Sequence, residues 1–301
     1  EKRTIGFVDR LDPEINQYVR QGAKIEILAE GFGWSEGPVW VDKLNALLFS
    51  DVPANKAYKW DEKNGLSVFL DPSGYTGIAP REKKANTNVM NRDESGSNGM
   101  VLDKYGQLII CMHGDRRIAK LEDWKKKNFS TIINKYNGRY FNSPNDLVYA
   151  KNGDLYFTDP PYGLKNQDND VLKELDFNGV FKLTPSGVLS LIIDDLTRPN
   201  GIAISNDQKT LYIAISDPND RRIMAYDITQ EGVENARVFF KDNDLTKEYN
   251  GNFDGIKIHP SGTIFSTGPG GVLVIKPDGT HLGTIRTEKS SANCCLLYTS
   301  D

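Results

Sequence analysis

The stretch Pro199-Asn200-Gly201-Ile202-Ala203-Ile204 contains, in six residues, the pattern that decides the fold. A small or apolar residue is followed by an oxygen-bearing side chain, then usually by glycine, and then by an apolar strand. The pattern occurs five times, with the oxygen-bearing residue at Glu36, Asn98, Asn145, Asn200 and Asp254, at intervals of 62, 47, 55 and 54 residues. Such self-similarity is typical of repeat proteins and predicts one supersecondary unit per copy.

The residues that follow each copy read as three further short strands. Turn residues such as Asn152-Gly153 and Ser261-Gly262 separate the first two strands. Third strands are expected at 56–60, 117–121, 179–183, 222–226 and 271–275, and fourth strands at 66–70, 189–193 and 236–240. Four strands in about 50 residues are typical of a propeller blade. The sequence therefore predicts an all-β fold, a six-bladed β-propeller with four-stranded blades around a central channel.

The sixth blade is expected to be incomplete. Ala292-Asn293-Cys294 matches the start of a sixth repeat, and the sequence ends at Asp301. A strand at 24–29 could supply the outer edge of that blade, since ring closure removes exposed sheet edges. We therefore expect an N-terminal extension at 1–23 with a short helix near 12–20, and a single catalytic propeller domain at 24–301. A second short helix is expected at 122–128.

Composition excludes several classes of protein. The 301 residues are 38% hydrophobic and 26% charged, with a net charge of −4. This balance is typical of a soluble globular chain. No apolar run approaches the roughly 20 residues of a membrane span. The mixed charges do not predict a nucleic-acid partner. A small-molecule ligand and a monomer or weak homo-oligomer are expected.

Cysteine and histidine do not predict a zinc site or a disulfide framework. Cys111 lies in an apolar run and is expected to be buried. Cys294 and Cys295 are adjacent, which disfavours pairing between them. The histidines lack metal-ligand spacing. We expect a periplasmic or cytoplasmic protein, and the absence of an initial Met favours the periplasm.

The repeat position predicts a cation site. In a propeller the inner strands line the channel, so the five oxygen-bearing residues that begin them should converge. An oxygen-only ligand set favours a hard cation such as calcium or magnesium. The ends of the second strands, at Asp51, His113, Asp159 and Asp217, should face the same mouth and form the walls of a small-ligand pocket. As an alternative, these residues are ordinary turn formers.

Several motifs in this order and spacing resemble a known family. They are Ser35–Trp40, Asn98–Asp103, His113–Arg117, Ser143–Leu147, Phe157–Leu164, Pro199–Ile202 and Asp254-Gly255. The chain resembles the gluconolactonase and senescence-marker-protein (regucalcin) family of six-bladed propellers, from about Ile25 to Cys295. The stretch Thr158–Leu164 is similar to the bacterial gluconolactonase branch.

The resemblance implies one divalent cation, usually calcium, with magnesium, zinc or manganese as alternatives. It implies that Glu36, Asn200 and Asp254 are ligands and that Asn145 is a ligand or a substrate contact. Asp254 would also be the catalytic acid/base. Substrate would be bound by Asn98, His113, Asn145, Asp159 and Tyr162. Ser143 stands where the animal branch has an arginine that meets the sugar, so sugar recognition should differ here.

The expected activity is hydrolysis of D-glucono-1,5-lactone to D-gluconate. The metal would polarise the carbonyl, and a base would activate water. Asp254 is expected to be that base, with His113 or Asp159 as alternatives. No Gly-x-Ser-x-Gly elbow is present. Two other functions stay open: hydrolysis of another lactone, ester or phosphotriester on the same metal, and a non-enzymatic calcium-binding propeller.

Overall fold

The computed structural model describes residues 3–88 and 91–297, and most of its regular structure is antiparallel β-sheet. The chain divides into two units, which are described separately. The central unit is Phe32–Pro199, and the terminal unit combines Glu1–Gly31 with Asn200–Asp301. No helix in the described part of the chain has the length and apolar character needed to cross a membrane.

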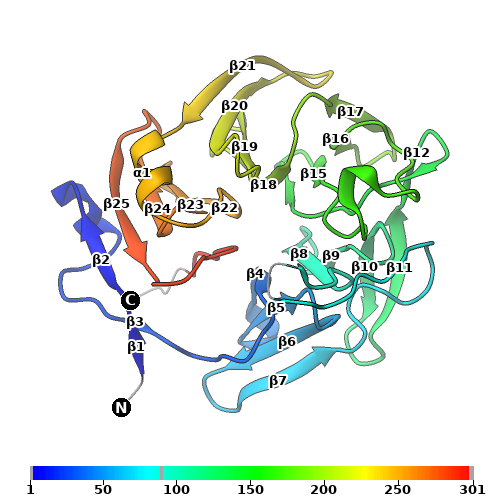
Figure 1. Cartoon of the computed structure of the whole chain (residues 1–301), viewed down its shortest axis with the longest axis horizontal. Helices are drawn as coiled ribbons and strands as arrows, with labels where there is room; N and C mark the ends of the chain where they lie inside the picture. Colours follow the sequence, from blue (N-terminus) through cyan, green and yellow to red (C-terminus); the bar gives the residue numbers. More distant parts are fainter. Residues whose placement is uncertain (1–2, 89–90, 298–301) are drawn as a thin grey trace. The chain divides into compact units, whose positions relative to one another are not determined.

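The central unit contains three four-stranded sheets in which consecutive strands are neighbours (Figure 1). The first sheet consists of β4 (Ser35–Val41), β5 (Ala46–Asp51), β6 (Lys56–Asp61) and β7 (Gly65–Leu70). The second consists of β8 (Ser97–Leu102), β9 (Leu108–Met112), β10 (Arg117–Asp123) and β11 (Asn128–Ile133). The third consists of β14 (Leu147–Tyr149), β15 (Leu155–Asp159), β16 (Gly179–Leu183) and β17 (Leu189–Ile193). The shorter elements are β12 (Lys135–Tyr136), β13 (Arg139–Tyr140) and the 3₁₀ turns η2 (Asp42–Leu44) and η4 (Gln167–Asn169).

The terminal unit contains one four-stranded and one five-stranded sheet. The fourth sheet consists of β18 (Pro199–Ile204), β19 (Thr210–Ile215), β20 (Arg222–Ile228) and β21 (Val233–Phe240). The fifth has five strands: β22 (Ile256–Ile258), β23 (Ile264–Gly268), β24 (Gly271–Ile275), β25 (His281–Arg286) and, outermost, β2 (Phe7–Arg10). The remaining elements are β1 (Thr4–Ile5), β3 (Ile25–Glu26), η1 (Pro13–Gln17) and α1 (Asn243–Glu248).

These sheets are the blades of a β-propeller, and the described residues form five of them. The expected sixth blade is therefore wrong. Ala292 does accept a hydrogen bond from the Gly255 N–H, at 2.9 Å, as an inner strand would. However, no described strand pairs with this segment. The outer-edge strand expected at 24–29 is also wrong, because Ile25–Glu26 pairs with β1 and β2 pairs with β25.

The two predicted helices have different outcomes. The one near 12–20 is present as η1, where the Asp12 side chain caps the Glu14 N–H at 2.8 Å and Pro13 begins the turn. The one expected at 122–128 is wrong. There the Asp123 carboxylate accepts the N–H groups of Lys125 and Lys126, so the chain turns back as a β10–β11 hairpin.

The core of the central unit lies between its sheets. Leu108, Ile110 and Met112 of β9 pack with the first sheet, and Ile109 and Cys111 pack with the third. All five are 1% exposed or less, which explains the uninterrupted apolar run and confirms the burial of Cys111. Burial of each of the Leu, Ile and Met side chains contributes about 1.5–3 kcal/mol.

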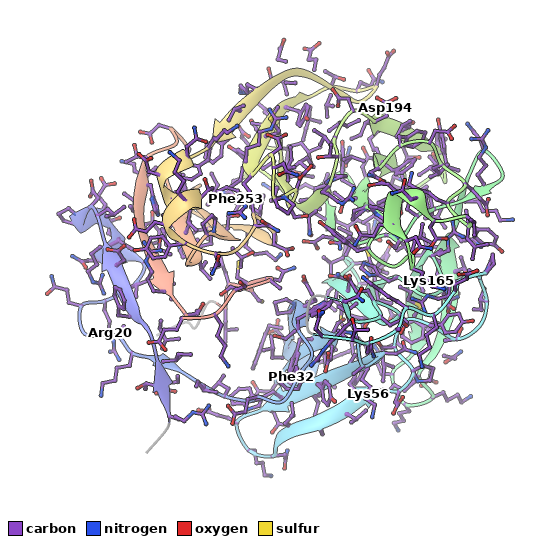
Figure 2. The ribbon with its side chains drawn as sticks, in the orientation of Figure 1. Arg20, Phe32, Lys56, Lys165, Asp194 and Phe253 are labelled. Carbon is purple, nitrogen blue, oxygen red and sulfur yellow. The ribbon has the colours of Figure 1, made fainter. Side chains whose placement is uncertain are left out.

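The core of the terminal unit contains aromatic and aliphatic side chains from the fourth and fifth sheets. Phe253, labelled in Figure 2, packs edge to face against Phe240 with ring centres 5.9 Å apart. On the fifth sheet, Ile15 of η1 packs against Phe265 and Leu282. The N-terminal residues are therefore part of this unit's core.

Candidate active site

The repeat residues of the central unit lie in consecutive sheets and are all buried. Glu36 is in β4, Asn98 is in β8, and Asn145 lies just before β14; each is 4% exposed or less. The glycine after two of them allows a close approach of backbones. A Cβ on Gly37 would lie 2.0 Å from the Asn98 carbonyl oxygen, and one on Gly99 would lie 2.7 Å from that of Asn145.

His113 links two of these residues. Its side chain is fully buried, and its Nε2 lies 3.4 Å from Asn98 Nδ2 and 3.3 Å from Asn145 Nδ2. Because amide NH₂ groups donate, Nε2 accepts and the ring proton lies on Nδ1. Burial and the nearby charge of Arg81 lower the pKa of His113 to about 3, so the ring is neutral at pH 7. The amide oxygens of both asparagines are thereby directed away from the imidazole.

Glu94 is a site residue that the sequence analysis missed. Its Oε2 lies 3.8 Å from His113 Nδ1, and its side chain is 15% exposed. Burial raises the pKa of Glu94 to about 8; the charge of Lys84 opposes this shift, and that of Glu36 adds to it. Glu94 lies outside the repeat pattern. The only sequence feature that marks it is the 62-residue interval between Glu36 and Asn98, the longest of the four.

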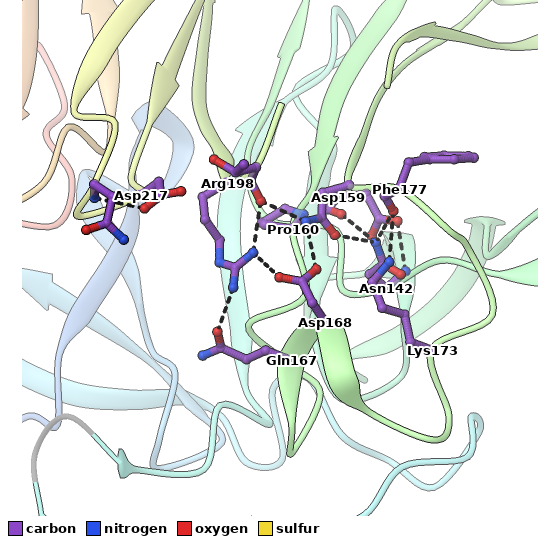
Figure 3. Close-up of polar contacts among 12 residues, drawn as sticks. Asn142, Asp159, Pro160, Gln167, Asp168, Lys173, Phe177, Arg198 and Asp217 are labelled. Atoms are coloured by element: carbon purple, nitrogen blue, oxygen red, sulfur yellow. Dashed lines mark hydrogen bonds and ion pairs between the residues drawn. The ribbon is translucent and has the colours of Figure 1, made fainter. Parts of the chain in front are cut away.

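Two predicted wall residues instead hold the loops that lead into the inner strands. Asp159 is fully buried, and its carboxylate accepts the N–H groups of Asn142 and Ser143, both at 2.8 Å (Figure 3). Asp51 accepts the Gly33 N–H at 3.1 Å in the same manner. Burial raises the pKa of Asp159 to about 7, and the two N–H groups oppose this shift. Asp159 therefore positions the segment that carries Asn145.

Ser143 and Tyr162 belong to one tightly bonded turn. The Ser143 hydroxyl donates to the Pro160 carbonyl at 2.6 Å and accepts the Gly163 N–H at 2.8 Å. Ser143 is fully buried, so it orders the turn that carries Tyr162. The Tyr162 ring centre lies 5.9 Å from the Arg198 guanidinium carbon. Arg198 in turn pairs with Asp168 (Figure 3).

The terminal unit brings Asn200 and Asp254 together. A Cβ on Gly201 would lie 1.8 Å from the Asp254 carbonyl oxygen, so the two backbones are in contact. Asn200 is 4% exposed and donates from Nδ2 to the Ser216 hydroxyl at 3.2 Å. Asp254 is half-buried, and its N–H donates to the Thr267 carbonyl at 3.2 Å. Asp217 accepts the Asn219 N–H at 2.9 Å.

The expected cation ligands differ from a cluster of His, Cys, Asp and Glu side chains. Among residues 3–88 and 91–297, no group of three or more His, Cys, Asp or Glu side chains is arranged to hold a metal ion. Two of the four ligands expected from the sequence, Asn145 and Asn200, are asparagines, which such a group does not include. In the central unit, Asn98 Oδ1 is buried without a hydrogen-bond partner. A buried amide oxygen of this kind suits a hard cation or a ligand hydroxyl.

Comparison with known proteins assigns the chain to a family. A profile of the SMP-30/gluconolactonase/LRE-like region matches residues 34–301. The chain belongs to this family. This SMP-30/gluconolactonase family member is 39% identical to a gluconolactonase of Zymomonas mobilis, over 97% of this chain and 81% of that protein.

Solved structures agree with that assignment. A structural-genomics target classed among the gluconolactonases has a TM-score of 0.81 and 30% identity, over 96% of this chain and 90% of its own. A gluconolactonase from Xanthomonas campestris has a TM-score of 0.79 and 26% identity, over 97% and 90% of the two chains. The family resemblance stated from the motifs is thus confirmed.

Proposed function

We propose that this protein hydrolyses a sugar lactone, with D-glucono-1,5-lactone as its model substrate and D-gluconate as its product. The observation that carries the proposal is the buried Asn98–His113–Asn145 cluster at the repeat positions of a gluconolactonase-family chain. A scaffold used only for protein contacts does not need buried amides with their oxygens directed to one side.

We propose that Glu36, Asn145, Asn200 and Asp254 hold one divalent cation, with calcium the first candidate. The support is the oxygen-only donor set, the unpartnered Oδ1 of the neighbouring Asn98, and the repeat pattern that relates the four positions. When bound, such an ion supplies Lewis-acid polarisation of a carbonyl. We predict that these four residues, which come from both units, converge on one cation.

The chain's own residues would carry the remaining steps. Water adds to the lactone carbonyl carbon, the ring C–O bond breaks, and the ring oxygen takes up a proton. We assign the transfer of the water's proton to Asp254, which contributes about 10²–10⁴-fold if it acts as a general base. His113 is neutral and holds two amide NH₂ groups, so it positions the Asn98 and Asn145 oxygens rather than moving a proton.

Substrate hydroxyls are assigned to Asn98, Asn145 and Tyr162. Asp159 contributes indirectly. Its carboxylate accepts two backbone N–H groups and thereby positions the segment that carries Asn145. The Ser143 hydroxyl is bonded within the turn that carries Tyr162, so it does not extend toward the sugar as an arginine side chain would. This arrangement supports a sugar site with neutral hydrogen-bonding walls.

The test is proton release from D-glucono-1,5-lactone in weak buffer, with the spontaneous rate subtracted. Activity should disappear with a chelator and return with calcium, magnesium, manganese or zinc in a measurable order. Asp254→Ala should lose the restored activity, whereas Asp244→Ala, at a carboxylate that is 96% exposed, should retain it. A folded protein that does not exceed the spontaneous rate with any of the metals would contradict the proposal.

A further inference from the structure

Apart from Glu94, which lies beside His113, the connection between β7 and β8, residues 71–96, has no role in the lactone chemistry proposed above. It accounts for the longest interval in the repeat, 62 residues against 47 to 55 elsewhere. We call these residues the insert. Residues 89–90 of it lie outside the described part of the chain.

Buried polar side chains of the blades hold the insert in place. Asp115, which is fully buried, accepts the Thr76 N–H at 2.8 Å and the Thr76 hydroxyl at 2.6 Å. Asn55 accepts the Tyr75 N–H at 3.0 Å and donates to the Tyr75 carbonyl at 3.1 Å. Arg116, also fully buried, donates to the Pro80 carbonyl at 3.4 Å. The motif at 113–117 thus anchors the insert as well as supplying His113.

An ion pair links two parts of the insert that are twelve residues apart in the sequence. Arg81 and Asp93 bond through two N–H···O contacts of 2.9 and 2.8 Å, with side chains 4% and 5% exposed. Arg81 also donates to the Gly163 carbonyl at 3.2 Å, next to Tyr162. A two-point pair this well buried is rigid, and its charges neutralise each other.

The anchored insert forms one side of a cavity of about 370 Å³. Its lining includes Asn55, Tyr75, Arg81, Asn86, Asp93 and Ser95, with Ala54 as an exposed lining residue. This volume is at the lower end of the range for small-molecule sites, and it suits one ring rather than an extended ligand. The lining is mostly polar and includes one aromatic ring.

The cavity adjoins the central unit's part of the candidate active site. Asp93 and Ser95 line the cavity, and Glu94 between them lies 3.8 Å from His113. On another side, Arg81 is bonded to the turn that carries Tyr162. A substrate held by Asn98 and Tyr162 would therefore have a second polar site as its neighbour.

We infer that this cavity is a subsite for a neutral, hydroxyl-rich group, the second sugar ring of a glycosylated aldonolactone. The inference rests on the proposed lactonase function. The buried Arg81–Asp93 pair adds no net charge to the lining, Asn86 and Ser95 bring neutral polar side chains to it, and the Tyr75 ring offers an apolar face to a sugar. Lys83 is an exposed lining residue, which does not by itself make an anion site.

The experiment compares kcat/KM for D-cellobiono-1,5-lactone and D-glucono-1,5-lactone. The wild-type protein should favour the disaccharide lactone at least fivefold, through KM. Ala54→Phe places a ring in the cavity and should lower that preference about tenfold. The matched control is Val188→Phe, at an exposed apolar residue 58% accessible and absent from the lining, and it should leave the preference unchanged.

Each outcome separates the subsite from the activity. Hydrolysis of gluconolactone with no preference for the disaccharide lactone overturns the subsite and leaves the function. Preference for a phosphorylated lactone over both overturns the assignment to a neutral group. If neither lactone is hydrolysed by the folded protein, the proposed function fails, and titration with methyl β-cellobioside decides the subsite alone. Binding that Ala54→Phe abolishes supports it, and no binding to the wild type overturns it.

Discussion

The ends of the second strands serve different purposes in neighbouring sheets of the central unit. In the first and third sheets the position holds Asp51 and Asp159, whose carboxylates accept backbone N–H groups of the incoming loop. In the second sheet it holds His113, which bonds the side-chain amides of Asn98 and Asn145. The same scaffold position therefore stabilises the fold in two sheets and orders the candidate site in the other.

The largest expected effect is on stability, at Asp159. Asp159→Ala leaves the N–H groups of Asn142 and Ser143 buried without an acceptor, at about 1–3 kcal/mol each. We expect the free energy of unfolding, measured in urea, to fall by about 2–5 kcal/mol. Asp176→Ala, at a side chain 94% exposed, is the control. Equal losses in the two variants would remove the distinction between a clamping and a surface carboxylate.

His113→Ala should separate site order from stability. Freed from the imidazole, the Asn98 and Asn145 amides can rotate, and a misplacement of about 1 Å costs on the order of 10²-fold. We expect kcat/KM for gluconolactone to fall by that factor in folded protein. Cys111→Ala changes a buried neighbour in the adjoining strand and should stay within twofold of wild type. Full activity in His113→Ala would show that the imidazole does not position the amides.

Gly99→Ala tests the spacing between the second and third sheets. The added Cβ would lie 2.7 Å from the Asn145 carbonyl oxygen and 2.9 Å from the Asp146 Cα, so the backbones must separate. Overpacking of this kind costs about 1–3 kcal/mol. Gly106→Asn, at an open position with φ +73° that asparagine tolerates, should cost much less. Unfolding midpoints in urea compare the two, and a cost no greater at Gly99 would contradict the close approach.

The smallest expected effect is a change in pH dependence at Glu94. Its pKa is about 8 in the folded protein against an ordinary 4.5, so the folded state binds the proton more tightly. Stability from this group is therefore lost as pH rises from about 4.5 to 8. With chelator present, the free energy of unfolding of Glu94→Gln should fall less steeply between pH 6 and 8 than that of the wild type. Glu82→Gln, at an exposed residue, should keep the wild-type slope; a parallel slope in Glu94→Gln would contradict the raised pKa.

The sequence predicts the blades well because each is a local unit. The expected strands 179–183 and 271–275 coincide with β16 and β24, since hairpin turns and apolar runs are encoded within a few residues. The predicted number of blades is wrong because it depends on pairing between segments that are far apart in the sequence. Which segment completes the fifth sheet depends on Phe7–Arg10 pairing with β25, and no local pattern specifies that choice.

Site prediction divides in the same way. His113 could be found because it lies at a repeat position. Glu94 and the Arg81–Asp93 pair could not, because the insert has no counterpart in the other repeats. Asp159 was placed correctly at a strand end, but only the hydrogen bonds reveal that its carboxylate faces backbone N–H groups.

The pairing of β2 with β25 also imposes an order in time. Phe7 is opposite Arg286, and Asp9 is bonded to Arg286 at 2.7 Å. At ordinary rates of synthesis, β2 leaves the ribosome roughly 15 to 60 seconds before its partner. During that interval the strand is an unpaired edge, and its shortness and its charges at Asp9 and Arg10 reduce mispairing with other chains. Completion of the fifth sheet is therefore expected to be a late event in the folding of the nascent chain.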